Sequence, residues 1–344
     1  MNSNGAPLVS IVTPVYNGEP YLKACIESVL TQSYNNFEYV ILNNCSSDKT
    51  LEIASGYAAR DHRVTVHSNE QVLPIIANHN KAFSLINPMS RYCKVVSADD
   101  WLFPECVARM VELAERNPSI GIVGSYQLCG GDGQWYVRNH GVSYYRPVIP
   151  GPEICRLHLL GQVSVFGNPT STLYRSDLVR STTDFYPNAT AEADRSACFQ
   201  ALLHSDYGFI QQVLSYERLH SNRTTTTSQT KNAYLSSAIS DCVIYGKSVL
   251  TETELEQRIA ALLNEYYLYL ASCAFRKQDH GFWQYHRVRL EEIGFPFDKK
   301  RLFTVIALKV ARLSLDPVRL IRILTERLPN NHRRRSERLL TGSV

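Results

Sequence analysis

The sequence has no run of about 18 apolar residues, so we expect no membrane-spanning helix. Its first ten residues, MNSNGAPLVS, lack the charged and apolar segments of a signal peptide. The nine cysteines are an odd number and include no C-x-x-C spacing, which disfavours a disulfide framework and the usual zinc sites. We therefore expect reduced thiols in a cytoplasmic protein. Neither sign of charge dominates, since 36 basic residues face 32 acidic ones, and whole-chain charge indicates no class of partner.

Two glycine-rich motifs of nucleotide-binding proteins are also absent. No G-x-G-x-x-G and no G-x-x-x-x-G-K-[ST] follows an expected strand, which disfavours a dinucleotide-binding fold and a P-loop fold. A nucleotidyltransferase is disfavoured as well, because no glycine-rich, basic phosphate-binding turn follows the first strand. With 44% hydrophobic and 20% charged residues, the composition is that of an ordinary globular protein.

What the sequence does contain is a regular alternation of strand and helix patterns. β-Branched runs predict strands at 8–13, 37–42, 64–67, 92–96 and 120–126, and helical spacing predicts helices at 19–32, 49–59, 78–86 and 104–117. This order predicts a doubly wound, mostly parallel α/β sheet. We expect irregular structure over 127–190, then a helix at 194–204, a strand within 207–214 and mostly helices from residue 228 on.

Three polar loops follow three of the expected strands, at 14–18, 43–48 and 97–100. Ligands of such sheets bind beyond the carboxyl ends of the strands, so these loops are candidates for one site. In the third loop, Asp99 and Asp100 place two like charges side by side after a buried strand. A divalent cation bound to a diphosphate would offset their repulsion, because Mg²⁺ and Mn²⁺ favour oxygen ligands. The alternative is a solvated cap in which Asp100 starts a helix.

Six blocks of the sequence resemble, in order, glycosyltransferase family 2, the inverting enzymes with the GT-A fold. They are VSIVTPVYNGEPYLKACIESVLTQSY, FEYVILNNCSSDKTLEI, NHNKAF with YCKVVSADDWLFPECV, FGNPTSTLYRSDLV, AEADRSACFQALL and LSYERLH, within residues 8–223. The resemblance implies a GT-A domain over residues 1–225 and a helical C-terminal region over 226–344. It implies metal-dependent, inverting transfer, with Mn²⁺ or Mg²⁺, from a nucleotide-diphosphate sugar, expected to be a UDP-sugar. The acceptor would be a saccharide in bacterial surface-polysaccharide synthesis. The alternative is a non-catalytic sugar-nucleotide-binding or scaffold protein of the same fold.

The resemblance also implies which residues contact the nucleotide. Pro14 and Tyr16 match the first loop of the family, which touches the base and the ribose. Asn43 and Asn44 stand where the family usually has two aspartates, the second of which accepts a hydrogen bond from the base. An amide accepts and also donates, so this departure leaves the base open; the alternative is a plain Asx-rich turn. Asn80 matches a polar position facing the nucleotide, and its alternative is an exposed helix residue.

For the metal, the resemblance makes Asp100 the direct ligand and Asp99 a ribose or water-mediated contact. Ser97 stands where the family often has a further carboxylate, so this assignment depends on the last two acids. Arg218 and His220 match an R-x-H block that would hold the diphosphate or complete the metal shell. The alternative for this block is an ordinary pair of cations at the end of a strand.

A general base must take the proton of the acceptor hydroxyl during inverting transfer. The base of the family matches Asp194, and Glu192 is the fallback. Both acids stand at the expected start of a helix, where the helix dipole alone would also favour them. The loop at 168–172, with its paired polar groups, resembles a sugar or acceptor loop.

The last part of the chain is basic. Residues 300–315, KRLFTVIALKVARLSL, have an apolar face edged by lysines and arginines. This pattern fits a helix lying on an anionic membrane surface, as peripheral contact with the inner face and a lipid-linked acceptor would require. It also fits a helix packed on the protein with a solvated basic face. The arginines at 333–335 have no accompanying nucleic-acid fold, so we expect no nucleic-acid partner.

Overall fold

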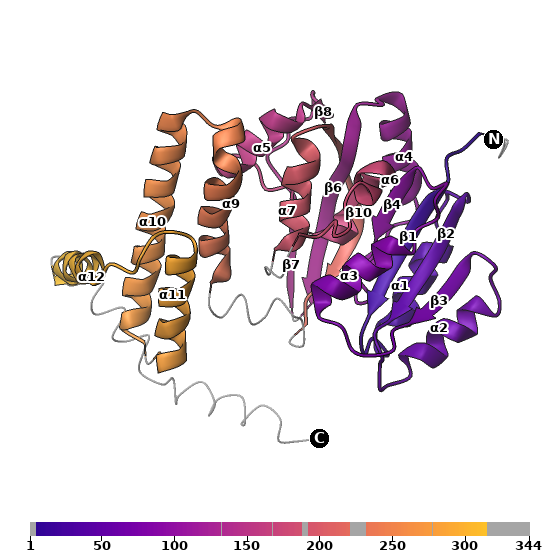
Figure 1. Ribbon diagram of the computed structural model, residues 1–344, viewed down its shortest axis with the longest axis horizontal. Helices are drawn as coiled ribbons and strands as arrows, with labels where there is room; N and C mark the ends of the chain where they lie inside the picture. The colour runs from indigo at the N-terminus through magenta and orange to yellow at the C-terminus, as the bar shows by residue number, and fades with distance from the viewer. Residues whose placement is uncertain are drawn as a thin grey trace, which may run out of the picture. The chain divides into compact units, whose positions relative to one another are not determined.

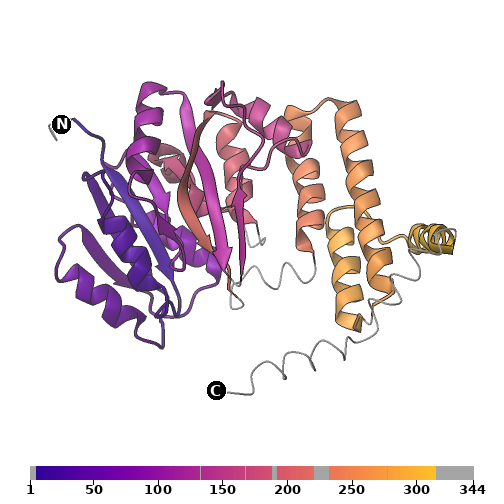
Figure 2. The ribbon, with the colours of Figure 1, turned by 180° about the vertical axis from the view of Figure 1, so that it is seen from behind.

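The computed structural model describes residues 5–131, 133–166, 168–187, 192–220, 232–276 and 278–314. The chain divides into two compact units, Met1–Arg258 and Ile259–Val344. In the described part of the first unit, a ten-stranded mixed sheet carries helices on both faces (Figures 1 and 2). This architecture confirms the predicted α/β fold.

The order of strands along the sheet is β3-β2-β1-β4-β9-β6-β10-β5, with β7 paired to β6 and β8 paired to β10. The strands are β1 (Val9–Val15), β2 (Phe37–Asn43), β3 (Val64–Ser68), β4 (Tyr92–Val95), β5 (Trp101–Leu102), β6 (Ile120–Gly131), β7 (Gln134–Arg138), β8 (Val148–Ile149), β9 (Thr172–Arg175) and β10 (Asp206–Arg218). β1 pairs in parallel with β2 and β4, and β6 pairs in parallel with β10. β9 runs antiparallel between β4 and β6, so its first residue lies at the edge where the parallel strands end.

The first unit contains helices α1 (Leu22–Leu30), α2 (Thr50–Ala58), α3 (Ile75–Ser84), α4 (Cys106–Arg116), α5 (Gly151–Leu159), α6 (Ser176–Arg180), α7 (Ala193–Leu202) and α9 (Ala233–Val249), and the 3-10 turn η1 (Pro169–Ser171). Apolar residues of α1, α2 and α4 form one core with Val9, Ile11 and Val15 of β1 on one face of the sheet. On the opposite face α3 contacts β1 and β2, and α7 contacts β6. Burial of alternate strand residues against each layer holds the strand ends in a fixed relation.

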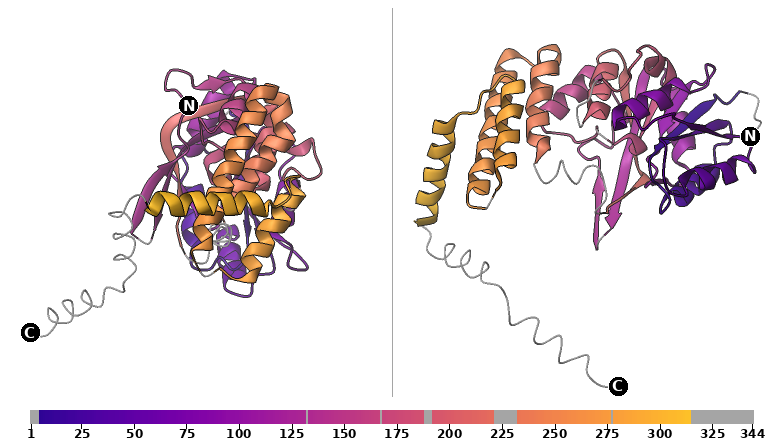
Figure 3. Two further views of the ribbon diagram at one scale, coloured as in Figure 1. Left: turned by 90° about the vertical axis from the view of Figure 1, so that its left-hand side faces the viewer. Right: turned by 60° about the horizontal axis from the view of Figure 1, so that its bottom comes forward.

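The predicted strands and helices before residue 120 are confirmed, with ends shifted by a few residues. The expectation of irregular structure over 127–190 is wrong, because β7, β8, α5, β9, α6 and the second half of β6 lie there. The residues of β7 are mostly exposed, so the strand lacks the alternation of apolar residues that predicts strands. Figure 3 shows β6 and β7, in magenta, projecting together from the sheet edge. β10 is also longer than expected and contains register shifts against β6.

In the described residues of the second unit, the later part of α10 (Glu252–Ala274) is followed by α11 (His280–Glu292) and α12 (Lys299–Ser314). The start of α10 lies in the first unit and has a capping box, with Thr251 N–H 3.0 Å from Glu254 Oε2 and Glu254 N–H 3.3 Å from Thr251 Oγ1. In α12, Leu302 is buried whereas Phe303 and Leu308 are exposed.

Several predictions about the C-terminal region stay predictions. The sheet ends near the expected domain boundary at 225, whereas the first compact unit continues to residue 258. In the described ranges, no helix is both long and apolar enough to cross a membrane. Contact of α12 with a membrane surface and a cytoplasmic location are not tested by this finding. The basic segment after residue 314, with its arginines at 333–335, lies outside the described residues.

All nine cysteines lie in the described residues and all are free thiols. Eight of them are buried, and Cys45 is partly exposed in the loop that follows β2. Burial raises the pKa of Cys25 and of Cys93 to about 12. Most of the thiols thus serve as small apolar side chains in the core.

Candidate active site

The three polar loops predicted to form one site lie next to one another at the carboxyl edge of the sheet. Asn17 Oδ1 accepts a hydrogen bond from Ser47 N–H at 2.8 Å, which joins the first loop to the second. Gly18 joins the first loop to the third, since a Cβ there would lie 2.5 Å from Val15 Cγ2 and 3.6 Å from Ala98 Cβ. The turn after β1 needs glycine at position 18, because a Cβ there would overlap the Val15 side chain, whereas its distance from Ala98 is an ordinary contact.

Of the two predicted base and ribose contacts, Pro14 and Tyr16 differ in accessibility. Pro14 is buried in β1 and pairs in register with Leu42 of β2. Tyr16 comes directly after the strand and is 54% exposed. Tyr16 is therefore the member of the pair whose ring a ligand can reach.

Asn43 and Asn44 have different roles at the end of β2. Asn43 Oδ1 accepts a hydrogen bond from Ser46 N–H at 3.1 Å, as the predicted Asx turn requires. Asn44 is 4% exposed, and its amide makes two hydrogen bonds to the Leu73 backbone. Its Oδ1 accepts from Leu73 N–H at 2.8 Å and its Nδ2 donates to Leu73 O at 2.9 Å. Asn44 Oδ1 also accepts from Asn69 Nδ2 at 2.8 Å. The predicted contact of Asn44 with a base would thus compete with bonds that fix the loop before α3.

The Asn80 amide forms a similar pair of hydrogen bonds to the backbone of Tyr186. Its Oδ1 accepts from Tyr186 N–H at 2.9 Å, and its Nδ2 donates to Tyr186 O at 2.9 Å and to Asp184 Oδ1 at 3.2 Å. The side chain is therefore not the free exposed group of the alternative interpretation. It joins α3 to the segment that precedes Glu192, and its predicted contact with a nucleotide stays a prediction.

Asp100 is a buried carboxylate rather than a solvated helix cap. It is 4% exposed, and the next residues form β5 instead of a helix, so the cap interpretation is wrong. Asp100 Oδ2 accepts from Thr170 Oγ1 at 2.7 Å, and Oδ1 accepts from Arg218 N–H at 3.1 Å. Burial and the neighbouring charge of Asp99 raise the pKa of Asp100 well above its usual value. A cation close to this carboxylate would oppose both effects.

Asp99 and His220, 121 residues apart in the sequence, meet at this edge. Asp99 Oδ2 lies 3.0 Å from His220 Nε2, and the two side chains are 33% and 16% exposed. His220 Nδ1 is buried and has no hydrogen-bond partner among the described residues. The histidine thus brings a ring nitrogen without a partner to the aspartate pair.

The Arg218 side chain is held beside Asp99 and Asp100 by the backbone oxygen of Asp99 and by aromatic rings. Its Nε donates to Asp99 O at 3.2 Å. Its guanidinium lies over the rings of Tyr21 and Trp101, at 4.8 and 5.0 Å from the ring centroids. Trp101 in turn stacks on Tyr216 at 3.7 Å. The predicted arginine is therefore fixed at the strand end, with its guanidinium bonded to the backbone oxygen of Asp99.

A divalent cation fits this group of residues, as His220 shows. An ionised Asp99 only accepts hydrogen bonds, so His220 Nε2 carries a hydrogen, and in the neutral form of the ring Nδ1 has a lone pair for a metal. Metal-binding histidines commonly donate their other N–H to a carboxylate in this way. Among the described residues no cluster of three or more possible ligands occurs. A cation held by Asp100 and His220 would therefore complete its shell with phosphate oxygens and water.

Asp194 lies in the first turn of α7, as predicted, and is partly buried. Burial raises its pKa above the usual value, although the Arg195 N–H, 2.8 Å from Asp194 Oδ1, opposes the rise. Glu192, the fallback base, is instead ion-paired with Arg195, which also pairs with Asp241 of α9 at 2.5 Å. Burial raises the pKa of Glu192 to about 7. At this helix start the Arg195 side chain is ion-paired with Glu192, whereas Asp194 is bonded to the Arg195 backbone N–H.

Sequence reasoning did not single out three polar residues near the site, Arg138, Glu217 and Lys94, whereas Thr170 lies in the loop at 168–172 that it did name. Arg138 pairs with Glu217 at 2.8 Å, and the charge of Arg138 favours the ionised form of Asp194. Glu217 also accepts from Asn168 Nδ2 at 3.1 Å. Lys94 and Thr170 lie behind Asp100. A visible signal existed for Lys94 alone, since a lysine interrupts the apolar run of β4.

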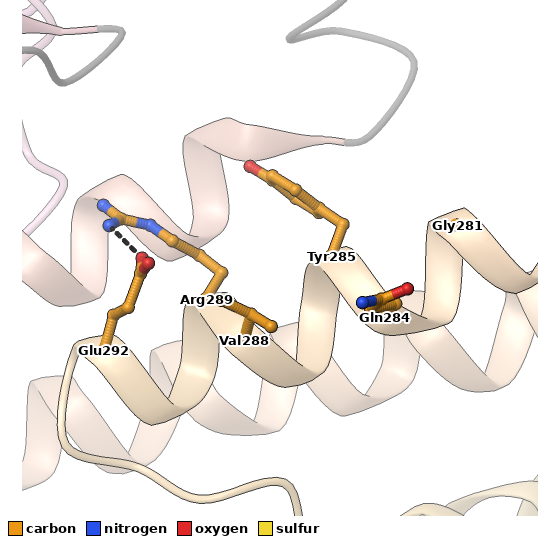
Figure 4. A pocket seen from close by; sticks show the side chains of 6 residues that line it. All are labelled: Gly281, Gln284, Tyr285, Val288, Arg289 and Glu292. Atoms are coloured by element: carbon orange, nitrogen blue, oxygen red, sulfur yellow. Dashed lines mark hydrogen bonds and ion pairs between the residues drawn. The ribbon is translucent and has the colours of Figure 1, made fainter.

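A surface depression in the second unit contains none of the predicted site residues. Figure 4 shows it along α11, lined by Gly281, Gln284, Tyr285, Val288, Arg289 and Glu292. The ion pair between Arg289 and Glu292, 3.2 Å long, lies at one end. The residues that line this depression include neither a pair of carboxylates nor a histidine, so they do not match the predicted metal site.

The sheet, its loops and its acidic edge define a nucleotide-sugar transferase fold of the GT-A type. The model of the family Glycosyl transferase family 2 matches residues 10–182, and the chain belongs to this family. This confirms the family that the sequence blocks resemble.

Two curated relatives illustrate the match. The chain is 30% identical over 147 residues to Glycosyltransferase GlyA of Streptococcus pneumoniae, covering 42% of this chain and 21% of that protein. It is 33% identical over 132 residues to the putative teichuronic acid biosynthesis glycosyltransferase TuaG of Bacillus subtilis, covering 38% of this chain and 51% of that protein. The matches thus span from a fifth to half of the length of these relatives.

Solved structures share the fold at low sequence identity. S. aureus TarS 1–349 in complex with UDP-GlcNAc has a TM-score of 0.58 at 16% identity, covering 78% of this chain and 76% of that chain. The mannosyltransferase PcManGT from Pyrobaculum calidifontis, in complex with GDP-Man and Mn²⁺, has a TM-score of 0.52 at 12% identity, covering 89% and 87%. The likeness extends over most of both chains and confirms the GT-A fold.

Proposed function

We propose that this chain is an inverting, metal-dependent glycosyltransferase that moves a sugar from a nucleotide-diphosphate sugar to a saccharide acceptor. The group of Asp99, Asp100 and His220 at the carboxyl edge of the sheet carries the proposal, because a buried and a partly exposed carboxylate beside a ring nitrogen without a partner among the described residues suit a cation on a diphosphate. Family membership supports sugar transfer. The UDP-GlcNAc complex of TarS supports a UDP-sugar as donor, and the name of TuaG supports an acceptor in surface polysaccharides.

In this proposal Asp100 and His220 Nδ1 hold the divalent cation, and Asp99 orients the imidazole. When bound, the cation supplies Lewis-acid stabilisation of the negative charge on the leaving diphosphate. Arg218 adds a fixed positive charge beside the same oxygens. The exposed ring of Tyr16 lies at the adjacent loop, where the base and the ribose would rest.

Asp194 acts as the general base. The acceptor hydroxyl attacks the anomeric carbon from the face opposite the diphosphate, and its proton passes to the Asp194 carboxylate. The bond between the anomeric carbon and the diphosphate oxygen breaks as the new glycosidic bond forms, so the anomeric configuration inverts. The charge of Arg138 favours the ionised form of Asp194 that this step requires.

Replacement of the base tests the proposal. Asp194→Asn should lower sugar transfer about 10²- to 10⁴-fold, because the amide cannot take the proton, while binding of Mn²⁺ and UDP stays at the wild-type level. Asp177→Asn on α6 is the matched control, since Asp177 is largely exposed and pairs with Arg175 away from the site. Transfer is measured as UDP release with a saccharide acceptor, and NMR of the product gives its anomeric configuration. Full transfer by Asp194→Asn, or nucleotide binding without turnover of any donor by the wild type, would contradict the proposal.

A further inference from the structure

Lys94 places a charged side chain in the middle of the sheet. It lies in β4 between Cys93 and Val95 and is completely buried. Its ammonium donates to two backbone carbonyl oxygens, Thr170 O at 2.9 Å and Thr172 O at 3.0 Å. Burial of a lysine is costly unless its hydrogens find partners, so these two bonds explain how the side chain is tolerated.

The two carbonyl groups belong to the turn η1 and the first residue of β9, where the chain enters the sheet. The ladder between β4 and β9 contains the pairs Tyr92–Arg175 and Cys93–Tyr174 and goes no further. Beyond that point the Lys94 ammonium replaces the strand-to-strand hydrogen bonds and holds the backbone around Thr170. Lys94 thus holds this turn from the β4 side, while the pairing of Thr172 with Gly124 of β6 and the hydrogen bond from Thr170 N–H to Asn168 Oδ1 hold it from elsewhere.

The Thr170 hydroxyl connects the turn to the metal motif. Its Oγ1 accepts from Ser97 N–H at 3.1 Å and lies 2.7 Å from Asp100 Oδ2. A hydroxyl has a single hydrogen, and an ionised carboxylate can only accept, so that hydrogen is directed at Asp100. With Arg218 N–H on Oδ1, each oxygen of Asp100 then has a fixed donor and the plane of the carboxylate is set.

We propose that Lys94 is a positioning residue for the metal motif, acting through Thr170: it fixes the backbone of η1 so that the Thr170 hydroxyl orients the Asp100 carboxylate toward the cation. The proposal rests on the proposed function and deepens it. Lys94 touches neither substrate nor cation, and its effect on them passes through Thr170. Ser97 takes part through its backbone N–H, which any residue except proline could supply at that position.

The test combines four variants of the full-length protein. Thr170→Val is isosteric and removes the hydroxyl, whereas Thr170→Ser keeps it. Lys94→Met removes the ammonium at similar length. Thr172→Val is the matched control, because the Thr172 hydroxyl donates to Pro169 O in the same turn, at 3.1 Å, and does not bond to Asp100. The affinity for Mn²⁺ in the presence of UDP is measured by calorimetry, and melting temperatures are recorded without ligand.

Thr170→Val and Lys94→Met should each weaken Mn²⁺ binding about tenfold, because loss of a group that orients a metal ligand typically costs that much. The double variant should be no weaker than Thr170→Val alone, since both changes remove the same orienting bond. Thr170→Ser and Thr172→Val should bind Mn²⁺ like the wild type. In transfer assays the first two variants should raise the Mn²⁺ concentration needed for half-maximal rate.

Other outcomes would overturn the inference. Additive losses in the double variant would mean that Lys94 affects Mn²⁺ binding independently of Thr170. A Lys94→Met protein that melts lower but binds Mn²⁺ normally would assign Lys94 a purely structural role. If Lys94→Met does not fold, Lys94→Gln, which keeps N–H donors, takes its place with the same expected non-additivity. A wild-type protein that binds no Mn²⁺ with UDP overturns the proposed function as well, whereas normal wild-type binding with unaffected variants overturns this inference alone.

Discussion

Asn44 and Asp100 each follow a parallel strand, each is 4% exposed, and each accepts two hydrogen bonds, yet one is neutral and the other charged. Asn44 stands in the half of the sheet formed by β1, β2 and β3, and its amide groups are used by Leu73 and Asn69. Asp100 stands in the half formed by β4 to β10, where Asp99 repels it. The hydrogen-bonding groups of Asn44 have partners within the protein, whereas the charge of Asp100 would be stabilised by a bound cation.

Two carboxylates of the second half and two carboxylates of the first half show pKa shifts in opposite directions. In the first half, the Arg63 guanidinium lowers the pKa of Asp61 to about 2. Hydrogen bonds from Thr50 and from the backbone overcome the effect of burial and lower the pKa of Asp48. In the second half, burial raises the pKa of Asp100 and of Asp194. Local partners thus stabilise the charges of the first half, and the second half keeps charges whose stabilisation would come from a bound ligand.

The largest effect, on Mn²⁺ affinity, is expected when the charge of Asp100 is removed. Asp100→Asn should weaken Mn²⁺ binding in the presence of UDP at least about 100-fold, because the neutral amide is a much poorer ligand for a hard cation. The fold without ligand should remain, since the amide oxygen still accepts a hydrogen bond and the repulsion from Asp99 is lost. Calorimetry with Mn²⁺ and UDP measures the affinity, and circular dichroism checks the fold. Wild-type affinity in this variant would remove Asp100 from the metal site.

The converse change places a charge in the neutral half. Asn44→Asp should lower the free energy of unfolding by about 3 kcal/mol at pH 7, because a carboxylate cannot donate to Leu73 O and is buried without a cation. Urea denaturation measures the loss. Asn36→Asp is the control, since Asn36 is exposed and its amide donates to Ala6 O near the chain start. An Asn44→Asp protein as stable as the wild type would show that this loop accepts a carboxylate as readily as the Asp100 loop does.

A smaller effect concerns pH. The pKa of Glu192 is raised to about 7, so the native state binds its proton more tightly than the unfolded state. Its contribution to stability is therefore full at low pH and falls as pH rises toward 7, by up to about 2 kcal/mol between pH 5 and pH 7. Glu192→Gln should remove this part of the slope. Denaturation curves at several pH values measure it, and equal slopes for both proteins would contradict the raised pKa.

The alternation of β1 to α4 could be predicted from the sequence because each element there buries one face and shows its period. The region from 127 to 187 could not, since the exposed β7 has no apolar alternation. Asp99 and Asp100 could be predicted from two like charges after a buried strand and His220 from the family resemblance, and the structure brings the three together. The partners of Asn44 and Asn80 lie 29 and 106 residues away, so no local pattern shows that these amides hold backbone. Lys94 was visible as a charge in an apolar strand, but its partners depend on how β9 enters the sheet.

The distribution of the thiols provides a way to label this protein without mutagenesis. Eight of the nine cysteines are buried, whereas Cys45 is partly exposed in the loop after β2, next to Asn44. A maleimide dye applied to the folded protein should react first at Cys45, because it needs an accessible thiol. Its fluorescence would then report events at the Asn44 end of the candidate site, whereas the Mn²⁺ experiments address the Asp100 end.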